Sequence, residues 1–154
     1  MAGLDEIYNT KLVELAADIP CSERVQSPDA TATAHSKLCG STVTIDLNMS
    51  GDTVSGYGQL VKACLLGQAA ASIVGRHIIG ATAQEVRDAG AAMRRMLKDE
   101  GPPPSGRFAE LELLEPVKHY RARHGSVLLT FDALEKAISE IEGRRATARQ
   151  SASG

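Results

Sequence analysis

The three cysteines are the residues of this chain best suited to metal or sulfur chemistry. Cys21, Cys39 and Cys64 cannot all pair with one another, and thiols in a reducing compartment stay free. A free thiol is a core residue, a nucleophile or a ligand for a soft metal or cluster. The spacing alone favours the first of these, because the chain contains no CxxC pair.

Two of the cysteines lie where a thiolate would be stabilised. Cys64 directly precedes a small-residue helix predicted over residues 65–79, whose N-terminus favours an anion, and Lys62 lies two residues earlier. Cys39 lies beside a glycine in a predicted hairpin tip, where backbone amides can face a bound anion. Cys21 lies in a polar loop, residues 20–29, and is predicted to have no role.

Strands are expected to bring these positions together. A helix is predicted over residues 4–18, followed by strands over residues 30–37, 42–49 and 53–61. The middle strand alternates cleanly between apolar and polar residues. In such a meander the first hairpin tip and the end of the third strand lie at the same end of the sheet. Cys39 and Cys64 are therefore expected to converge there.

Helices follow the strands. Residues 82–85 (TAQE) form a capping box that opens a helix ending near residue 98. A rigid, exposed, proline-rich linker is predicted over residues 101–106, and a short helical piece over residues 108–114. The order predicts an α+β fold, in which a three-stranded antiparallel meander is packed on one face by helices.

The last helix is predicted over residues 126–142, with Gly143 as its stop. Ser126 is favoured as its N-cap, because a serine side chain accepts from free backbone amides there. One domain is expected over residues 1–143, followed by a disordered tail over residues 144–154.

The composition narrows the function classes. Hydrophobic residues make up 43% and charged residues 23% of the chain, which is typical of a globular domain. A formal charge of −2 and only 3% aromatic residues argue against nucleic acid as a partner. The N-terminus has no apolar run typical of a secretory signal, and no segment is long enough to span a membrane. We therefore expect a cytoplasmic protein with no membrane partner.

Several motifs follow one another along the chain in a distinctive order. Residues 38–47 (LCGSTVTIDL) precede GDTV at residues 51–54, and residues 64–72 (CLLGQAAAS) follow them. Further on come residues 115–123 (EPVKHYRAR) and residues 128–135 (LLTFDALE). Over roughly residues 5–143, this pattern resembles the NifU/IscU/SufU-type iron–sulfur cluster assembly scaffolds, and most of all the SufU-type subgroup. The resemblance implies a SufE/NifU-like fold.

The resemblance also implies a ligand set of three cysteines and one aspartate. Cys39 and Cys64 match the first two cysteines, whereas Ser41 stands at the aspartate position and Ser126 at the third cysteine. Hydroxyls are poor ligands for iron or zinc, and imidazole is a competent replacement, so His124 becomes a candidate. The predicted metal ligands are Cys39, Cys64, His124 and Ser126, with His35 and His119 as further candidates.

By resemblance, the chain is a scaffold and not an enzyme. Iron or an iron–sulfur cluster, of the 2Fe–2S type, would assemble on the thiolates with sulfur from a cysteine desulfurase and pass to cluster-acceptor proteins. One alternative is a zinc-bearing persulfide acceptor that relays sulfur from a desulfurase. Another is a metal-free, degenerate interaction module. The incomplete ligand set also allows a cluster shared between two copies in a homodimer.

Overall fold

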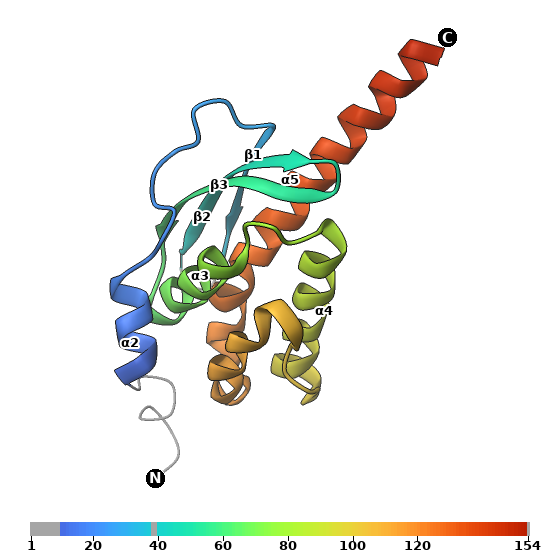
Figure 1. Cartoon of the computed structure of the whole chain (residues 1–154). Coiled ribbons are helices and arrows are strands. Elements are labelled where there is room, and N and C mark those ends of the chain that lie inside the picture. The colour runs from blue at the N-terminus through green and yellow to red at the C-terminus, as the bar shows by residue number, and fades with distance from the viewer. Residues whose placement is uncertain (1–9, 38–39, 154) are drawn as a thin grey trace.

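Three strands form one antiparallel sheet in the computed structural model, which describes residues 10–37 and 40–153 (Figure 1). The strands β1 (Ala30–His35), β2 (Thr42–Ser50) and β3 (Thr53–Lys62) lie in the order β1-β2-β3. β1 ends two residues before its predicted end, because the backbone turns there and the amide of Ser36 donates to the carbonyl of Ser41 at 2.9 Å. The predicted three-stranded meander is confirmed.

One face of the sheet carries the hydrophobic core. Val43, Ile45 and Leu47 of β2 are fully buried, whereas Thr42 and Thr44 on the opposite face are half-exposed. Complete burial of such a side chain contributes about 1.5–3 kcal/mol, so the alternation determines which face the helices cover. α5 (Arg121–Ser153) packs across β1 and β2, and α3 (Leu65–His77) packs beside it. This arrangement confirms the α+β fold with helices on one face.

The opposite face is partly covered by the loop that precedes β1. Asp46 of β2 is only 1% exposed there, and its carboxylate accepts two hydrogen bonds from Arg24, at 2.6 and 3.0 Å. The amide of Val25 and the hydroxyl of Thr31 donate to the same carboxylate. The loop lies so close that a Cβ at Gly58 would be 2.3 Å from the carbonyl oxygen of Glu23. The predicted polar loop over residues 20–29 therefore packs against this face of the sheet and is hydrogen-bonded to it.

The Asp46 carboxylate should make stability depend on pH. Hydrogen bonds from Arg24 hold the pKa of Asp46 below its usual value, against the opposing effect of burial. This stabilisation is present above the ordinary carboxyl pKa of about 4 and is lost as the pH falls through the lowered folded value. We expect Asp46→Asn to lower the free energy of unfolding by about 1–3 kcal/mol at pH 7.

Urea unfolding at neutral pH and below about pH 4 measures this effect. The Asp46→Asn chain should lose less stability on acidification than the parent chain does. Asp52→Asn, in the exposed β2–β3 turn, is the matched control and should keep the parent's pH dependence. An unchanged pH dependence in Asp46→Asn would contradict the assignment.

Helices at both ends of the chain depart from their predicted bounds. α2 spans Thr10–Ala17, and Leu12 and Leu15 are buried as their helical spacing predicted; the first part of the predicted helix lies outside the described residues. α5 begins at Arg121, not at residue 126, and continues through Gly143 to Ser153. The predicted stop at Gly143 is wrong, because a helical glycine costs only about 1 kcal/mol and good helix formers follow it.

Two arginines attach the later part of α5 to the rest of the molecule. Arg145 donates to the carbonyl oxygen of Met49 at 2.7 Å and also to that of Gly51, and Arg144 donates to that of Asp29. Beyond these contacts the C-terminal end of α5 projects away from the other elements (Figure 1). The division into a domain ending at residue 143 and a separate tail stays a prediction. Within residues 10–37 and 40–153, no helix is both long and apolar enough to cross a membrane.

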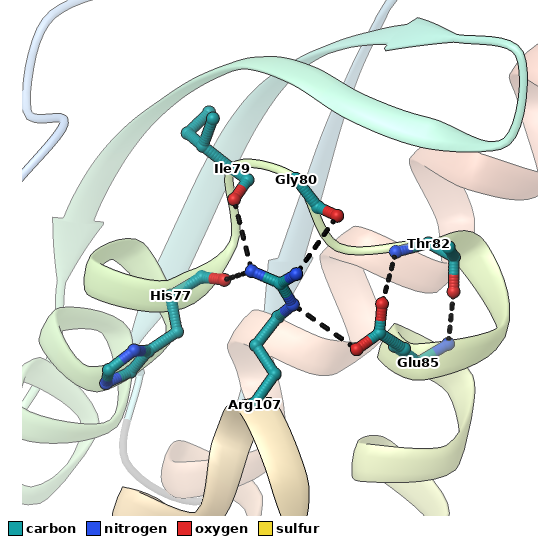
Figure 2. Close-up of polar contacts among 6 residues, drawn as sticks. All are labelled: His77, Ile79, Gly80, Thr82, Glu85 and Arg107. Carbon is teal, nitrogen blue, oxygen red and sulfur yellow. Dashed lines mark hydrogen bonds and ion pairs between the residues drawn. The ribbon is translucent and has the colours of Figure 1, made fainter.

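The predicted capping box at the start of α4 (Ala83–Asp99) is confirmed. The hydroxyl of Thr82 accepts from the amide of Glu85, and the Glu85 carboxylate accepts from the amide of Thr82, each at 3.0 Å. The Glu85 carboxylate also pairs with Arg107 at 3.3 Å. Figure 2 shows both sets of contacts together.

Arg107 joins three elements through its guanidinium. It lies at the start of η1 (Gly106–His119), a 3-10 helix that extends well beyond the short piece predicted. Besides pairing with Glu85, it donates to the carbonyl oxygens of three residues at the end of α3 and just past it: His77 at 3.4 Å, Ile79 at 3.3 Å and Gly80 at 3.2 Å (Figure 2). The preceding proline-rich segment is not wholly exposed as predicted, because Pro104 is buried.

Loss of the Arg107 contacts should weaken the junction between α3, α4 and η1. A cation at a helix C-terminus and hydrogen bonds to free carbonyls each contribute about 1 kcal/mol. We expect Arg107→Met to lower the free energy of unfolding by about 1–2 kcal/mol in denaturant titrations. Arg95→Met removes an exposed arginine from α4 and should have a smaller effect. Equal losses in the two variants would contradict the role given to Arg107.

Candidate functional site

Cys64 lies at the junction where β3 ends and α3 begins. It is the N-cap of α3, with extended backbone (φ −66°, ψ 171°), and its carbonyl accepts from the amide of Gln68 at 2.9 Å. Its side chain is partly buried. The structure therefore confirms the predicted placement of Cys64 at a helix start.

Two buried hydroxyls lie beside the Cys64 thiol. The hydroxyl oxygen of Ser126, on α5, lies 3.2 Å from the sulfur of Cys64 and 3.4 Å from the hydroxyl oxygen of Ser41. Ser126 is 1% exposed and Ser41 is 3% exposed. Three positions from distant parts of the sequence thus meet at one end of the sheet. They are the positions that the motif comparison assigns to the second cysteine, the third cysteine and the aspartate.

A glycine in α3 makes this convergence possible. A Cβ at Gly67 would lie 2.5 Å from the Ser126 hydroxyl oxygen and 2.8 Å from the Cβ of Ala63. Any side chain at this position would push α5 away from α3. Gly67 is thus a site-forming residue. It was not predicted from the sequence, although its place in a run of small residues after Cys64 is a visible signal.

Cys39 lies outside the described residues, so its ligand role stays a prediction. Its neighbours in the chain are described: the amide of Gly40 donates to the carbonyl of Ser36 at 2.9 Å, and Ser36 in turn bonds to Ser41. This turn holds Ser41 next to Ser126. Cys39 precedes Ser41 by two residues in the sequence.

His124 does not join the Cys64 cluster among the described contacts. Its Nε2 lies 3.0 Å from the carbonyl oxygen of Val117 and 3.2 Å from that of Lys118. Carbonyls only accept, so Nε2 carries the proton and donates to both. On α5 two residues are separated by about 200°, which places His124 on the other side of the helix from Ser126. The geometry therefore favours Ser126 over His124 as the neighbour of Cys64.

Ser126 was predicted to be the N-cap of the last helix, and this prediction is wrong. α5 already begins at Arg121, so Ser126 lies inside the helix with its hydroxyl turned toward Cys64 and Ser41. The capping interpretation failed because it depended on a helix start that is five residues too late. The position instead belongs to the candidate site.

The remaining candidates lie apart from this cluster. His35 ends β1 and is exposed, as is His119 at the end of η1. The thiol of Cys21 is half-buried 3.8 Å from the carbonyl oxygen of Gly75, and burial raises its pKa, which favours the neutral thiol. Within the described residues no group of three histidine, cysteine or acidic side chains could hold a metal ion. The described cluster therefore offers one thiol and two hydroxyls.

No protein-family model and no curated protein matches the chain. The crystal structure of a nitrogen-fixing NifU-like protein (N-terminal) from Brucella abortus is 51% identical to it, with a TM-score of 0.90. The similarity covers 91% of this chain and 97% of that chain. The chain belongs to the NifU-like family.

A second solved structure shares the fold of this NifU-like chain. It is described as a scaffold protein for iron–sulfur cluster assembly by the SUF system, from the thermophile Fervidobacterium islandicum AW-1. The two are 20% identical, with a TM-score of 0.80, over 88% of this chain and 99% of that chain. The family indicated by the motifs is confirmed.

Proposed function

We propose that this chain is an iron–sulfur cluster assembly scaffold that carries iron or a cluster as cargo. Membership of the NifU-like family supports the proposal, as does the same fold in the Fervidobacterium protein described as a scaffold. The single observation that carries it is the group of side chains around Cys64. The hydroxyl oxygen of Ser126 lies 3.2 Å from the sulfur of Cys64 and 3.4 Å from the hydroxyl oxygen of Ser41. Such a protein holds and transfers its cargo and catalyses no turnover of its own.

The donor groups suit a transient cargo. Cys64, as a thiolate at a helix N-terminus, is a soft ligand for iron, and Cys39 supplies the second thiolate. The hydroxyls of Ser41 and Ser126 are poor ligands, but each can donate a hydrogen bond to a thiolate or sulfide. Two thiolates leave coordination positions for an acceptor protein, a small ligand or a second copy of the chain.

A sulfur relay is the second candidate function. It is favoured by the side chains described around Cys64, because one thiol is enough to accept a sulfur atom. A cysteine desulfurase carrying a persulfide (R–S–SH) would transfer its outer sulfur to the Cys64 thiolate. The products would be Cys64–S–SH and the thiolate R–S⁻, so no external oxidant or reductant is needed. The zinc-bearing form of this candidate is weaker, because the described cluster lacks the closed set of four nitrogen and sulfur ligands typical of structural zinc. A metal-free interaction module needs neither a sulfur-accepting thiol nor a set of metal ligands.

One measurement separates the scaffold from the zinc-bearing relay and from the candidates that bind no metal. The protein is purified and reconstituted without oxygen, with ferrous iron and sulfide, and then analysed for iron, acid-labile sulfide and zinc. We expect iron and sulfide together, with visible absorption from a cluster. Zinc alone would support the zinc-bearing relay, and well-folded protein that takes up neither metal nor sulfide would leave the metal-free relay and the interaction module.

A further inference from the structure

A cationic hollow lies on the other side of α5 from the Ser126 hydroxyl. It has a volume of about 530 Å³ and lies between the end of α4, the end of η1 and the first turns of α5. Its lining is Leu97, Lys98, Lys118, Arg121, His124 and Gly125. A Cβ at Gly125 would lie 3.2 Å from the hydroxyl oxygen of Ser36, which begins the turn that holds Ser41. The cationic hollow therefore borders the candidate site.

The charges around the hollow are poorly balanced. Within the described residues, Lys98 and Arg121 form no ion pair or hydrogen bond through their side chains, and Lys118 meets only Glu115, at 3.6 Å. Most other arginines of the chain are paired with carboxylates: Arg24, Arg76, Arg87, Arg94, Arg107 and Arg144. Like charges gathered at one hollow repel one another, and an anion placed among them relieves that repulsion. The chain as a whole carries a charge of −2, so the local excess is not a general property.

We propose that the cationic hollow receives an acidic segment of a partner protein that docks beside the Cys64 cluster. The cations lie on long side chains from three elements, and Lys98 and Arg121 are exposed. This arrangement matches several carboxylates spread along a peptide. Leu97 also lines the hollow, but its side chain is only 2% exposed, so the contacts open to the segment are those of the cations.

A small free oxyanion fits the hollow less well than an acidic segment does. Small anions are held by donors that converge at hydrogen-bond distance from one point. The buried imidazole of His124 is the rigid donor here, and its Nε2 is already committed to the carbonyls of Val117 and Lys118. The open, flexible rim instead suits charge complementarity with a protein surface, which guides docking and weakens as salt screens it.

The test uses a fluorescein-labelled peptide of alternating Glu and Leu residues and the metal-free full chain. Fluorescence anisotropy at low ionic strength gives the affinity. The Lys98→Gln/Arg121→Gln variant should bind at least about tenfold more weakly than the parent chain. Lys11→Gln/Arg95→Gln removes the same two charges from exposed positions outside the hollow, and should change the affinity less than about twofold.

Three results would overturn the proposal: no binding of the peptide, equal weakening in both variants, or displacement by inorganic phosphate far beyond that by chloride at equal ionic strength. The second result would mean that only net charge matters, and the third that the ligand is a small oxyanion. Circular dichroism confirms that both variants fold. Because no metal is present, the outcome is independent of whether the chain carries a cluster.

Discussion

Replacing Cys64 by alanine should remove most of the iron and sulfide that the chain takes up in anaerobic reconstitution. Cys64 is the one thiol among the described side chains of the candidate site, and its loss leaves there only the hydroxyls of Ser41 and Ser126. Removing a metal ligand costs much more than the 10–100-fold typical of changes to the groups that support ligands, so we expect a loss of at least about 100-fold in affinity. Cluster absorption and acid-labile sulfide per chain measure it, and Cys39→Ala should have the same effect.

Cys21→Ser is the matched control, because it removes one thiol and leaves the side chains of Cys64, Ser126 and Ser41 unchanged. Cys21 is half-buried against Gly75 and makes no described contact with Cys64 or Ser126. Its variant should keep the full metal content and lose no more than about 1 kcal/mol of stability. If Cys21→Ser loses bound metal, or if Cys64→Ala keeps it in well-folded protein, the ligands have been misassigned.

Patterns with strong periodicity predicted their elements well. β2 alternates so regularly that its buried face, its partners and the side covered by helices all follow from the sequence. The capping box of α4 is equally local, since four adjacent residues contain the whole signal. The convergence of β2 and β3 with the start of α3 then follows from the topology of a meander. The placement of Ser41 near Cys64 is a consequence of this local order.

Features that depend on tertiary contacts could not be predicted in the same way. Asp46 looks like an exposed strand residue until the loop carrying Arg24 folds over it. The start of α5 at Arg121 moves Ser126 from a helix cap into the helix interior, which changes the direction of its side chain. His124 was chosen for its chemistry and its closeness in sequence to Ser126, but helix geometry separates the two. The motif identifies positions, and only the fold determines which side chains meet.

Restoring the missing ligands should turn the site into a tight zinc site. The Ser126 hydroxyl oxygen lies 3.2 Å from the sulfur of Cys64, so a cysteine at position 126 would place its sulfur near the Cys64 sulfur. Two sulfurs that share one zinc ion at about 2.3 Å each lie no more than about 4 Å apart, which this geometry allows. The absence of a side chain at Gly67 is what lets the side chain at position 126 approach α3 this closely. With Cys39 as a further thiolate, Ser41→Asp/Ser126→Cys would complete three thiolates and one carboxylate.

We expect Ser41→Asp/Ser126→Cys to bind zinc at least about 100-fold more tightly than the parent chain, because two poor hydroxyl donors become a thiolate and a carboxylate. Competition with a chromophoric chelator under reducing conditions measures the affinity. Ser139→Cys adds one thiol at an exposed position on α5 and should leave the affinity unchanged. Adding Cys64→Ala to the double variant should remove most of the gain, because the new ligands act together with Cys64. A gain that survives Cys64→Ala, or that Ser139→Cys reproduces, would show that zinc binds elsewhere, and Ser41 and Ser126 would then not occupy ligand positions in this chain.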